Sequence, residues 1–326
     1  MTDAKPDLLL IGSATPYMRD RMAEDFTVHS LPSEAERESF FAEVGPKIVA
    51  VTVYGGAGLP GEVMDRLPNL KVISNYGVGY DAVDTPRAVA RGILISHTPD
   101  VLNDEVANTA ILLWLATSRK LAAYDAYVRA GRWASEGNPA LTRGTQGRTV
   151  GIIGMGRIGQ AIAARLPVFG ARILYHARSA RDLPYEYFAD LTEMARQSEV
   201  LICITPGGPA TRHLVNAEVI EALGPEGILV NVSRGTVVDE EALVAALLDG
   251  RLGGAGLDVF ENEPQVPEAL FAMENVTLQP HIGSASEETR RAMGDLACDN
   301  LVQFLKDGTV LTPVPECREM NAKAAG

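Results

Sequence analysis

The sequence predicts an α/β protein with two discontinuous, doubly wound parallel-sheet domains. Three observations predict this fold. Short β-branched runs alternate with helical segments, and a glycine-rich turn joins a strand to a helix. The length of 326 residues is greater than that of an ordinary domain with a single hydrophobic core. Strands that alternate with helices imply a parallel sheet covered on both faces. At about 150 residues per domain, the length fits two domains.

The first part of the chain has the pattern of an α/β unit without a phosphate-binding fingerprint. Apolar runs of strand length lie at 8–11, 47–53, 70–74 and 92–95, with helical segments such as 34–43 and 62–67 between them. The glycine-rich stretch 55–58 follows a strand. We expect a loop there that is approached closely by either a ligand or a neighbouring segment.

A break at Pro99 marks the first predicted domain boundary. Asn103, Asp104 and Glu105 then provide an N-cap and an acidic first turn for a long helix that runs to about Gly131. Its apolar residues occupy more than one face, which is typical of a buried or subunit-interface helix.

The stretch 149–181 carries the most informative motif. An apolar run at 150–153 leads into a G-x-G-x-x-G sequence, and a helical pattern and a second strand at 171–175 follow. Such glycines allow a tight turn, close approach of a pyrophosphate and close helix packing. The helix N-terminus attracts the phosphates. We therefore predict a Rossmann dinucleotide-binding domain, with cofactor contacts at Gly154, Gly156, Arg157, Ile158 and Gly159.

Two other features of this domain can be predicted. Pro167 should kink or shorten the first Rossmann helix. A last helix over 287–305 should return to the first domain. The predicted domains are therefore a substrate-binding domain of 1–99 plus 287–326 and a dinucleotide-binding domain of 100–286.

The end of the second Rossmann strand indicates which dinucleotide binds. An NAD site has an acidic residue there, about 20 residues past the glycines, for the ribose 2′-OH. Here no acid occurs before Asp182, and Arg178, Ser179 and Arg181 precede it. Arginines bind a 2′-phosphate through charge-assisted hydrogen bonds. We predict NADPH, with NADH possible; the alternative is a solvated basic loop.

Composition excludes several classes of protein. A net charge of −13 argues against a nucleic-acid partner. The odd number of widely spaced cysteines (203, 298 and 317) indicates reduced thiols and no zinc or other metal site. The N-terminus lacks a signal-peptide pattern, and the longest apolar stretch, 106–117, is too short to span a membrane. We expect a soluble cytoplasmic protein.

Three side chains with catalytic chemistry follow later strands predicted at 200–204, 227–232, 255–259 and 276–278. They are Arg234, Glu263 and His281, at the sheet edge where ligands bind in open α/β folds. Arginine can clamp a carboxylate, and histidine can move a proton near neutral pH. A carboxylate can orient that histidine. Each residue taken alone is more often structural, but together they form a coherent set.

In these features the chain resembles the D-isomer-specific 2-hydroxyacid dehydrogenase family, and within it the glyoxylate/hydroxypyruvate reductase branch. The segments that carry the resemblance are NYGVGYDAVD (75–84), HTPDVLNDEVANTA (97–110), GIIGMGRIG (151–159), NVSRGTVVDEEAL (231–243), GAGLDVFENEP (254–264) and LQPHIGSAS (278–286). The resemblance implies a Rossmann NAD(P)-binding domain, a flavodoxin-like substrate domain and a homodimer.

The resemblance also implies roles for individual residues. Arg234 would bind the substrate carboxylate and carbonyl oxygen, His281 would be the acid/base with Glu263 as its partner, and the N–H groups of Val78 and Gly79 would hold the carboxylate. Further contacts would come from Tyr76, Trp133 and Ser284 to the substrate, and from Thr205, Pro206, Thr211, Ser233, Asp258 and His281 to the cofactor, Asp258 meeting the nicotinamide carboxamide. Trp133 would reach the neighbouring subunit, or else be a core or interface aromatic.

Two positions refine the comparison. Ala177 stands where NAD-dependent members carry Asp, which supports NADP. Glu263, rather than Gln, before the proline argues against formate dehydrogenases.

We expect reduction of glyoxylate to glycolate and of hydroxypyruvate to D-glycerate. The alternatives are a reductase of bulkier aryl or sugar-derived 2-oxo acids, which Tyr54, Tyr76 and Tyr80 could contact, or a non-catalytic dinucleotide-sensing binding protein.

Overall fold

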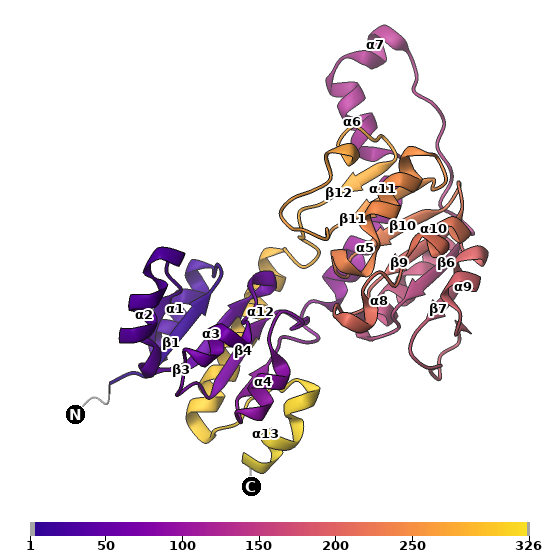
Figure 1. Cartoon of the computed structure of the whole chain (residues 1–326). Coiled ribbons are helices and arrows are strands. Elements are labelled where there is room, and N and C mark those ends of the chain that lie inside the picture. Colours follow the sequence, from indigo (N-terminus) through magenta and orange to yellow (C-terminus); the bar gives the residue numbers. More distant parts are fainter. Residues whose placement is uncertain (1–3, 325–326) are drawn as a thin grey trace. The chain divides into compact units, whose positions relative to one another are not determined.

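The computed structural model describes residues 4–324, and the chain folds into two compact units (Figure 1). Unit 1 runs to Leu102 and resumes at Ser286, and unit 2 comprises Asn103–Ala285. Each unit is built on its own sheet, in which all neighbouring strands are parallel. The predicted fold class, α/β with two parallel-sheet domains, is confirmed.

Unit 1 contains a five-stranded sheet in the order β2-β1-β3-β4-β5. Its strands are β1 (Asp7–Ile11), β2 (Thr27–Ser30), β3 (Ile48–Tyr54), β4 (Val72–Tyr76) and β5 (Leu94–Ser96). This order is the flavodoxin-like arrangement. The helices are α1 (Pro16–Asp25), α2 (Arg37–Glu43), α3 (Gly61–Asp65), α4 (Thr85–Ala90), α12 (Glu287–Asp307) and α13 (Arg318–Ala324). Both segments of the chain contribute, since α12 packs against β4.

The loop after β3 answers a question that the sequence left open. Gly58 has φ +67°, and a Cβ added there would lie 2.6 Å from the carbonyl oxygen of Ala82. Leu59 and Val83 form a bridge beside it. A neighbouring segment, rather than a ligand, is therefore what requires glycine at position 58.

Unit 2 contains a seven-stranded sheet in the order β12-β11-β10-β9-β6-β7-β8. Its strands are β6 (Thr149–Ile153), β7 (Arg172–His176), β8 (Glu186–Phe188), β9 (Val200–Cys203), β10 (Ile228–Asn231), β11 (Gly254–Leu257) and β12 (Val276–Leu278). The helices are α5 (Asn103–Ser118), α6 (Leu121–Arg129), α7 (Arg132–Glu136), α8 (Arg157–Arg165), α9 (Leu191–Gln197), α10 (Ala217–Leu223) and α11 (Glu240–Leu248).

Strand β11 shows how the sheet is covered on both faces. Ala255 and Leu257 belong to the core cluster shared with α9, α10 and α11. Gly256 points the other way, because successive residues of a strand face opposite sides. A Cβ on Gly256 would lie 2.9 Å from Cβ of Leu113 in α5. The glycines of this strand let α5 pack close to the sheet.

The prediction of one helix from Asn103 to about Gly131 is wrong. α5 begins at Asn103 with an acidic first turn but ends at Ser118, and Lys120 adopts a left-handed φ of +49° before α6. Gly131, with φ +72°, separates α6 from α7. No glycine or proline marks the first break. The result is an arm of α6 and α7 that projects from the rest of unit 2 (Figure 1).

Pro167 acts as predicted. The α-helical part of α8 ends at Arg165, and a 3-10 turn, Leu166–Phe169, carries the proline near its start. Proline lacks the N–H that would continue the α-helical hydrogen bonds. Across residues 4–324, no helix has the length and apolar character needed to cross a membrane.

Candidate active site

The two predicted proton-handling side chains meet in unit 2. Glu263 lies in the segment that follows β11, and His281 lies in the loop after β12. Nδ1 of His281 is 2.8 Å from Oε2 of Glu263. The other carboxylate oxygen, Oε1, accepts a hydrogen bond from the backbone N–H of Phe260 at 3.0 Å. The carboxylate is therefore fixed at both oxygens, and one of them orients the imidazole.

The electrostatics of this pair favour an ionised carboxylate. Burial raises the pKa of Glu263, but the hydrogen bond and charge of His281, the Phe260 N–H and the charge of Arg234 outweigh it, so the pKa lies below its usual value. With Nδ1 held by the carboxylate, Nε2 of His281 has no partner among residues 4–324. This nitrogen can exchange a proton with a ligand.

Asp258 holds the backbone on which His281 stands. His281 has φ +52°, a conformation that is uncommon for a residue other than glycine. Its N–H donates to the carbonyl oxygen of Asp258 at 2.7 Å. The N–H groups of Ile282 and Gly283 donate to Oδ1 and Oδ2 of Asp258 at 2.7 and 2.8 Å. Burial raises the pKa of Asp258, and these two N–H groups oppose the rise. The predicted cofactor contact of Asp258 stays a prediction, as does the substrate contact of half-buried Ser284.

Arg234 is presented by a turn that its neighbours organise. The Oδ1 atom of Asn231, at the end of β10, accepts hydrogen bonds from N and Oγ of Ser233, at 3.0 and 2.6 Å. Nδ2 of Asn231 donates to the carbonyl oxygen of Arg234 at 3.1 Å. The Ser233 hydroxyl, a predicted cofactor contact, is thus already engaged within the turn.

Gly235 brings this turn onto the segment that precedes Glu263. A Cβ on Gly235 would lie 1.9 Å from the carbonyl carbon and oxygen of Phe260, so no side chain fits there. The charge of Arg234 lowers the pKa of Glu263. The structure therefore brings Arg234, Glu263 and His281 into one region of unit 2, as the sequence predicts for a catalytic set.

The glycine motif fits a dinucleotide. Gly154 has φ +103°, and a Cβ on it would meet the Ile204 carbonyl oxygen at 2.9 Å. A Cβ on Gly159 would meet the Gly154 carbonyl oxygen at 2.1 Å, so helix α8 sits directly on the strand end. A Cβ on Gly156 would meet nothing within 4 Å. Gly156 is the N-cap of α8 and makes no side-chain cap. The backbone here leaves open space in front of a helix N-terminus.

A buried hydroxyl beside the motif also fits a bound group. Oγ1 of Thr205 is buried and has no hydrogen-bond partner among the described residues. Cγ2 of the same side chain would lie 3.1 Å from a Cβ on Gly154. Because buried polar atoms are normally satisfied, this hydroxyl is suited to a ligand. Thr211 donates through Oγ1 to the carbonyl oxygen of exposed Pro206 at 2.8 Å, which shapes the loop after Thr205.

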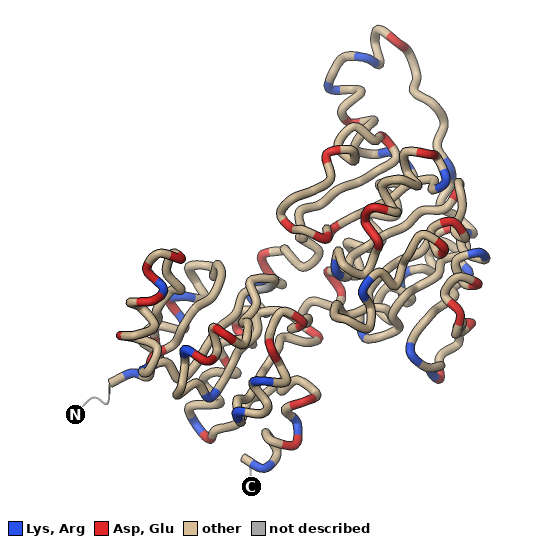
Figure 2. Tube along the Cα trace, in the orientation of Figure 1, with Lys and Arg blue, Asp and Glu red and all other residues tan. Residues whose placement is uncertain are grey.

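The basic loop after β7 is held by its backbone. The hydroxyl of Tyr175 donates to the carbonyl oxygen of Arg181 at 3.2 Å and accepts from the N–H of Arg181 at 2.8 Å. The side chains of Arg178, Ser179 and Arg181 are exposed. Figure 2 shows Lys and Arg positions interspersed with Asp and Glu positions along the chain. Within residues 4–324, no carboxylate pairs with either arginine. The loop offers two cations from a fixed backbone.

In unit 1, the predicted carboxylate loop follows β4. Nδ2 of Asn75 donates to the carbonyl oxygens of Gly77 and Gly79, both at 3.0 Å. The N–H groups of Val78 and Gly79 have no acceptor among the described residues. Asn75 thus fixes the carbonyl groups of this loop. The backbone N–H groups of Val78 and Gly79 are left for an anion.

The side chain of Tyr76 is buried in unit 1. The ring is 2% exposed, and its hydroxyl donates to the carbonyl oxygen of Arg290 at 2.8 Å. Burial is the main cause of its raised pKa. The Tyr76 side chain thus points into the core, although the residue ends a strand at a ligand-binding edge, and its contact with the substrate stays a prediction.

Trp133 lies in the arm, on α7, and is not a core residue. Its side chain is 56% exposed, and Nε1 donates to Oδ1 of Asn138 at 2.9 Å.

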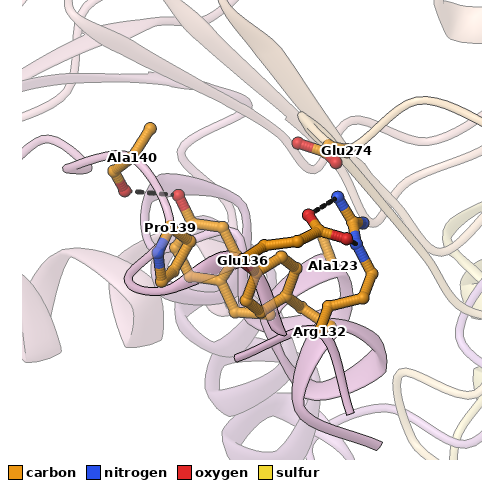
Figure 3. A pocket seen from close by; sticks show the side chains of 8 residues that line it. Ala123, Arg132, Glu136, Pro139, Ala140 and Glu274 are labelled. Carbon is orange, nitrogen blue, oxygen red and sulfur yellow. Dashed lines mark hydrogen bonds and ion pairs between the residues drawn. The ribbon is translucent and has the colours of Figure 1, made fainter. Parts of the chain in front are cut away.

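A hollow in the arm is lined by Ala123, Tyr124, Tyr127, Arg132, Glu136, Pro139, Ala140 and Glu274 (Figure 3). Arg132 and Glu136 form an ion pair across its wall, with 2.9 Å between Nη2 and Oε2. None of the predicted catalytic side chains lines this hollow.

Sequence reasoning missed three residues that organise these loops. Asn75 and Asn231 are amide side chains at or next to the carboxyl ends of buried strands, and that feature could have singled them out. Glu240, the first residue of α11, accepts the backbone N–H of Glu261 at 3.1 Å. Nothing in the sequence distinguishes Glu240 from Glu241 beside it.

Comparison with known proteins agrees with this geometry. Residues 111–283 match the family model "D-isomer specific 2-hydroxyacid dehydrogenase, NAD binding domain". The solved structure of the NADPH-dependent glyoxylate/hydroxypyruvate reductase of Sinorhizobium meliloti, in complex with NADP and malonate, is 46% identical with a TM-score of 0.89, covering 96% of this chain and 98% of that one.

Two curated relatives have nearly the same length as this chain. The hydroxyphenylpyruvate reductase of Plectranthus scutellarioides is 43% identical over 94% of this chain and 98% of its own. The 2-ketogluconate reductase of Gluconobacter oxydans is 43% identical over 95% and 99%. The chain belongs to the D-isomer-specific 2-hydroxyacid dehydrogenase family, in its glyoxylate/hydroxypyruvate reductase branch.

Proposed function

We propose that this protein is an NADPH-dependent reductase of small 2-oxo acids, converting glyoxylate to glycolate and hydroxypyruvate to D-glycerate. The observation that carries the proposal is the His281–Glu263 pair, 2.8 Å apart, close enough to Arg234 for its charge to act on the carboxylate. A dinucleotide-sensing protein without catalysis would have no use for an oriented imidazole, so this arrangement favours an enzyme.

The residues of unit 2 have distinct roles in this proposal. Arg234 binds the carboxylate and carbonyl oxygen of the 2-oxo acid through its guanidinium. The imidazole of His281 donates the proton to the oxygen that becomes the hydroxyl group, from Nε2, and Glu263 stabilises the protonated ring. In unit 1, the N–H groups of Val78 and Gly79 are our candidates for a carboxylate, because Asn75 fixes the loop that carries them.

The cofactor site is proposed on the glycine motif and the loop after β7. The bound nicotinamide would supply the hydride that reduces the C2 carbonyl. Gly154, Gly156 and Gly159 fit the pyrophosphate, and Thr205 offers an unsatisfied buried hydroxyl. Arg178, Ser179 and Arg181 are proposed to bind the 2′-phosphate, which is supported by two arginines that no carboxylate neutralises among residues 4–324.

We also infer a cytoplasmic homodimer in which the arm of α6 and α7 contacts the second subunit. The arm and the segment after it expose apolar side chains that a monomer would leave in water, among them Leu121, Val128, Trp133 and fully exposed Leu141. Sedimentation of the Leu141→Glu variant beside the wild type tests this inference. A monomeric wild type would contradict it.

A second candidate function is reduction of aryl or sugar-derived 2-oxo acids. It is favoured by the 43% identity to both a hydroxyphenylpyruvate reductase and a 2-ketogluconate reductase. The same chemistry would serve these substrates, because hydride and proton are transferred at the 2-oxo group that all of these acids share.

The test is kcat/KM for glyoxylate, hydroxypyruvate, hydroxyphenylpyruvate and 2-ketogluconate, each with NADPH and with NADH. We expect the two small acids to be preferred, and NADPH to be favoured by about tenfold or more, equivalent to about 1.4 kcal/mol. Arg178→Ala should reduce that preference. Equal rates with NADH would refute the phosphate assignment, and preference for the larger acids would favour the second candidate.

A further inference from the structure

Arg290 is a cation of unit 1 that has no carboxylate partner among residues 4–324. It lies in the first turns of α12 and is half-buried. The chain has 42 acidic residues, yet none pairs with Arg290 within the part of the chain that the structure describes. Arg21, by comparison, pairs with both Asp295 and Asp299 of the same helix. A partly desolvated charge is normally paired, so Arg290 is suited to a ligand.

The partner that Arg290 does have is a tyrosine. Nη1 of Arg290 donates to the hydroxyl oxygen of Tyr54 at 3.2 Å. The guanidinium carbon lies 5.8 Å from the ring centroid of Tyr54 and 5.9 Å from that of Tyr76. Because Tyr54 accepts this bond, its own hydroxyl proton remains available, and it has no acceptor among residues 4–324. Apart from the bond between them, the hydrogen-bond donors of the Tyr54 and Arg290 side chains have no acceptor among residues 4–324.

The position of Tyr54 places these donors at a ligand-binding edge. Tyr54 and Tyr76 are register partners at the ends of β3 and β4, and their rings stack at 5.0 Å with an interplanar angle of 18°. The carboxyl edge of a parallel sheet is where ligands bind in such folds. The loop with the available N–H groups of Val78 and Gly79 begins directly after Tyr76.

The hydroxyl proton of the other nearby tyrosine, Tyr80, already has an acceptor. Tyr80 donates through its hydroxyl to Oε2 of Glu316 at 3.1 Å, and burial together with that carboxylate raises its pKa to about 12. Of the three tyrosines that the sequence suggests, only Tyr54 combines a half-buried ring with an uncommitted hydroxyl proton in the described chain.

We propose that Tyr54 and Arg290 form a subsite of unit 1 that binds an oxygen substituent on C3 of the 2-oxo acid. The proposal rests on the proposed function; within it, the subsite acts on hydroxypyruvate, because glyoxylate has no C3. Guanidinium N–H groups form charge-assisted hydrogen bonds to that oxygen. A site built to bond a substrate hydroxyl discriminates against an analogue that lacks it, because its own polar groups are left unsatisfied.

The experiment compares hydroxypyruvate with pyruvate, which differ only in the C3 hydroxyl group. The variants are Arg290→Gln and Tyr54→Phe, the latter keeping the ring that stacks on Tyr76. Arg291→Gln and Tyr17→Phe are matched controls, because Arg291 is the next residue of α12 and lies over the Tyr17 ring at 4.5 Å. The measured quantity is the ratio of kcat/KM for hydroxypyruvate to that for pyruvate, with NADPH saturating.

We expect the wild type to prefer hydroxypyruvate. The ratio should fall about tenfold in Arg290→Gln and several-fold in Tyr54→Phe, as for the loss of a hydrogen bond to a charged and a neutral donor. Both controls should keep the wild-type ratio. A ratio that is unchanged in Arg290→Gln and Tyr54→Phe, or a loss of equal size on both substrates, overturns the subsite and leaves the proposed function standing. A wild type that reduces no 2-oxo acid overturns both.

Discussion

The carboxylate of Glu240 accepts a hydrogen bond from the backbone N–H of Glu261, 3.1 Å away. It thereby ties the start of α11 to the segment that carries Glu263. Burial raises the pKa of Glu240, the N–H of Glu261 lowers it, and the charges of Glu261 and Glu263 raise it again, for a net rise. The native protein consequently binds this proton more tightly than the unfolded chain does.

The Glu240→Gln variant should therefore change how stability depends on pH. In the wild type, the free energy of unfolding contributed by Glu240 decreases as pH rises from the unfolded pKa of about 4.5 through the raised native value. Gln keeps an acceptor for the Glu261 N–H but does not titrate. We expect the variant to be more stable than the wild type at pH 7 and to lose that advantage below pH 4.5. Urea unfolding at several pH values measures this, with exposed Glu241→Gln as the control; parallel curves for Glu240→Gln and the wild type would contradict the assignment.

Removal of His281 should abolish turnover while dinucleotide binding persists. We expect His281→Asn to lower kcat by about 100- to 10,000-fold, the usual contribution of a positioned acid. Quenching or enhancement of NADPH fluorescence reports binding separately. A variant that retains near wild-type turnover would refute the role of His281.

Glu263→Gln should lower turnover because it weakens the contact that orients His281. Oε2 of Glu263 lies 2.8 Å from Nδ1 of His281, and the pKa of this carboxyl lies below its usual value because His281 and Arg234 outweigh the effect of burial. Gln has a similar size but no charge, so we expect kcat to fall by about tenfold or more. Glu261→Gln removes a carboxylate of the same segment that pairs with Arg212 instead, and it should keep the wild-type kcat. An unchanged kcat in Glu263→Gln would contradict the orienting role of Glu263.

Two glycines of one motif should respond differently to alanine. Gly156 has an ordinary φ of −78°, and a Cβ there meets nothing within 4 Å, so Gly156→Ala should unfold at the wild-type urea concentration but bind NADPH about tenfold more weakly. A Cβ on Gly159 would lie 2.1 Å from the Gly154 carbonyl oxygen, so Gly159→Ala should lose about 1–3 kcal/mol of stability. Undiminished NADPH affinity in Gly156→Ala would show that no pyrophosphate approaches this residue.

Asp258→Asn should loosen the loop that carries His281. The amide can accept only one of the N–H groups of Ile282 and Gly283, and an unsatisfied buried donor costs about 1–3 kcal/mol. We expect kcat to fall by about tenfold or more and the Ile282 and Gly283 amides to exchange hydrogen faster. Asp249→Asn, at an exposed ion pair with Arg251, is the control. Unaltered amide exchange would exclude this positioning role.

The parts of the fold that the sequence predicts are those with two buried faces. Strands such as β6 and β9 are uninterrupted apolar runs, whereas β2 and β8 lie at the sheet edges, are short and half-exposed, and went unnoticed. The break at Lys120 has no local signal, because nothing in its sequence requires a left-handed residue.

The predicted site residues follow a similar division. Arg234, Glu263 and His281 could be chosen because each is a chemically capable side chain within a few residues of the end of an apolar strand. Contacts between distant positions could not be predicted. Tyr54 and Arg290 are 236 residues apart in the chain, and only the packing of α12 against the sheet brings them together.

That packing also sets an order of events during synthesis. Ser74 of β4 donates to the carbonyl oxygen of Ala297, which emerges from the ribosome 223 residues later. At about 5–20 residues per second, β4 waits roughly ten to forty-five seconds for the helix that covers it. Unit 2 is made within that interval, but its last residue, Ala285, precedes Ala297 by only 12 residues. The sheet that is made first is therefore covered last, and a chain released before α12 lacks the helix that packs on β4.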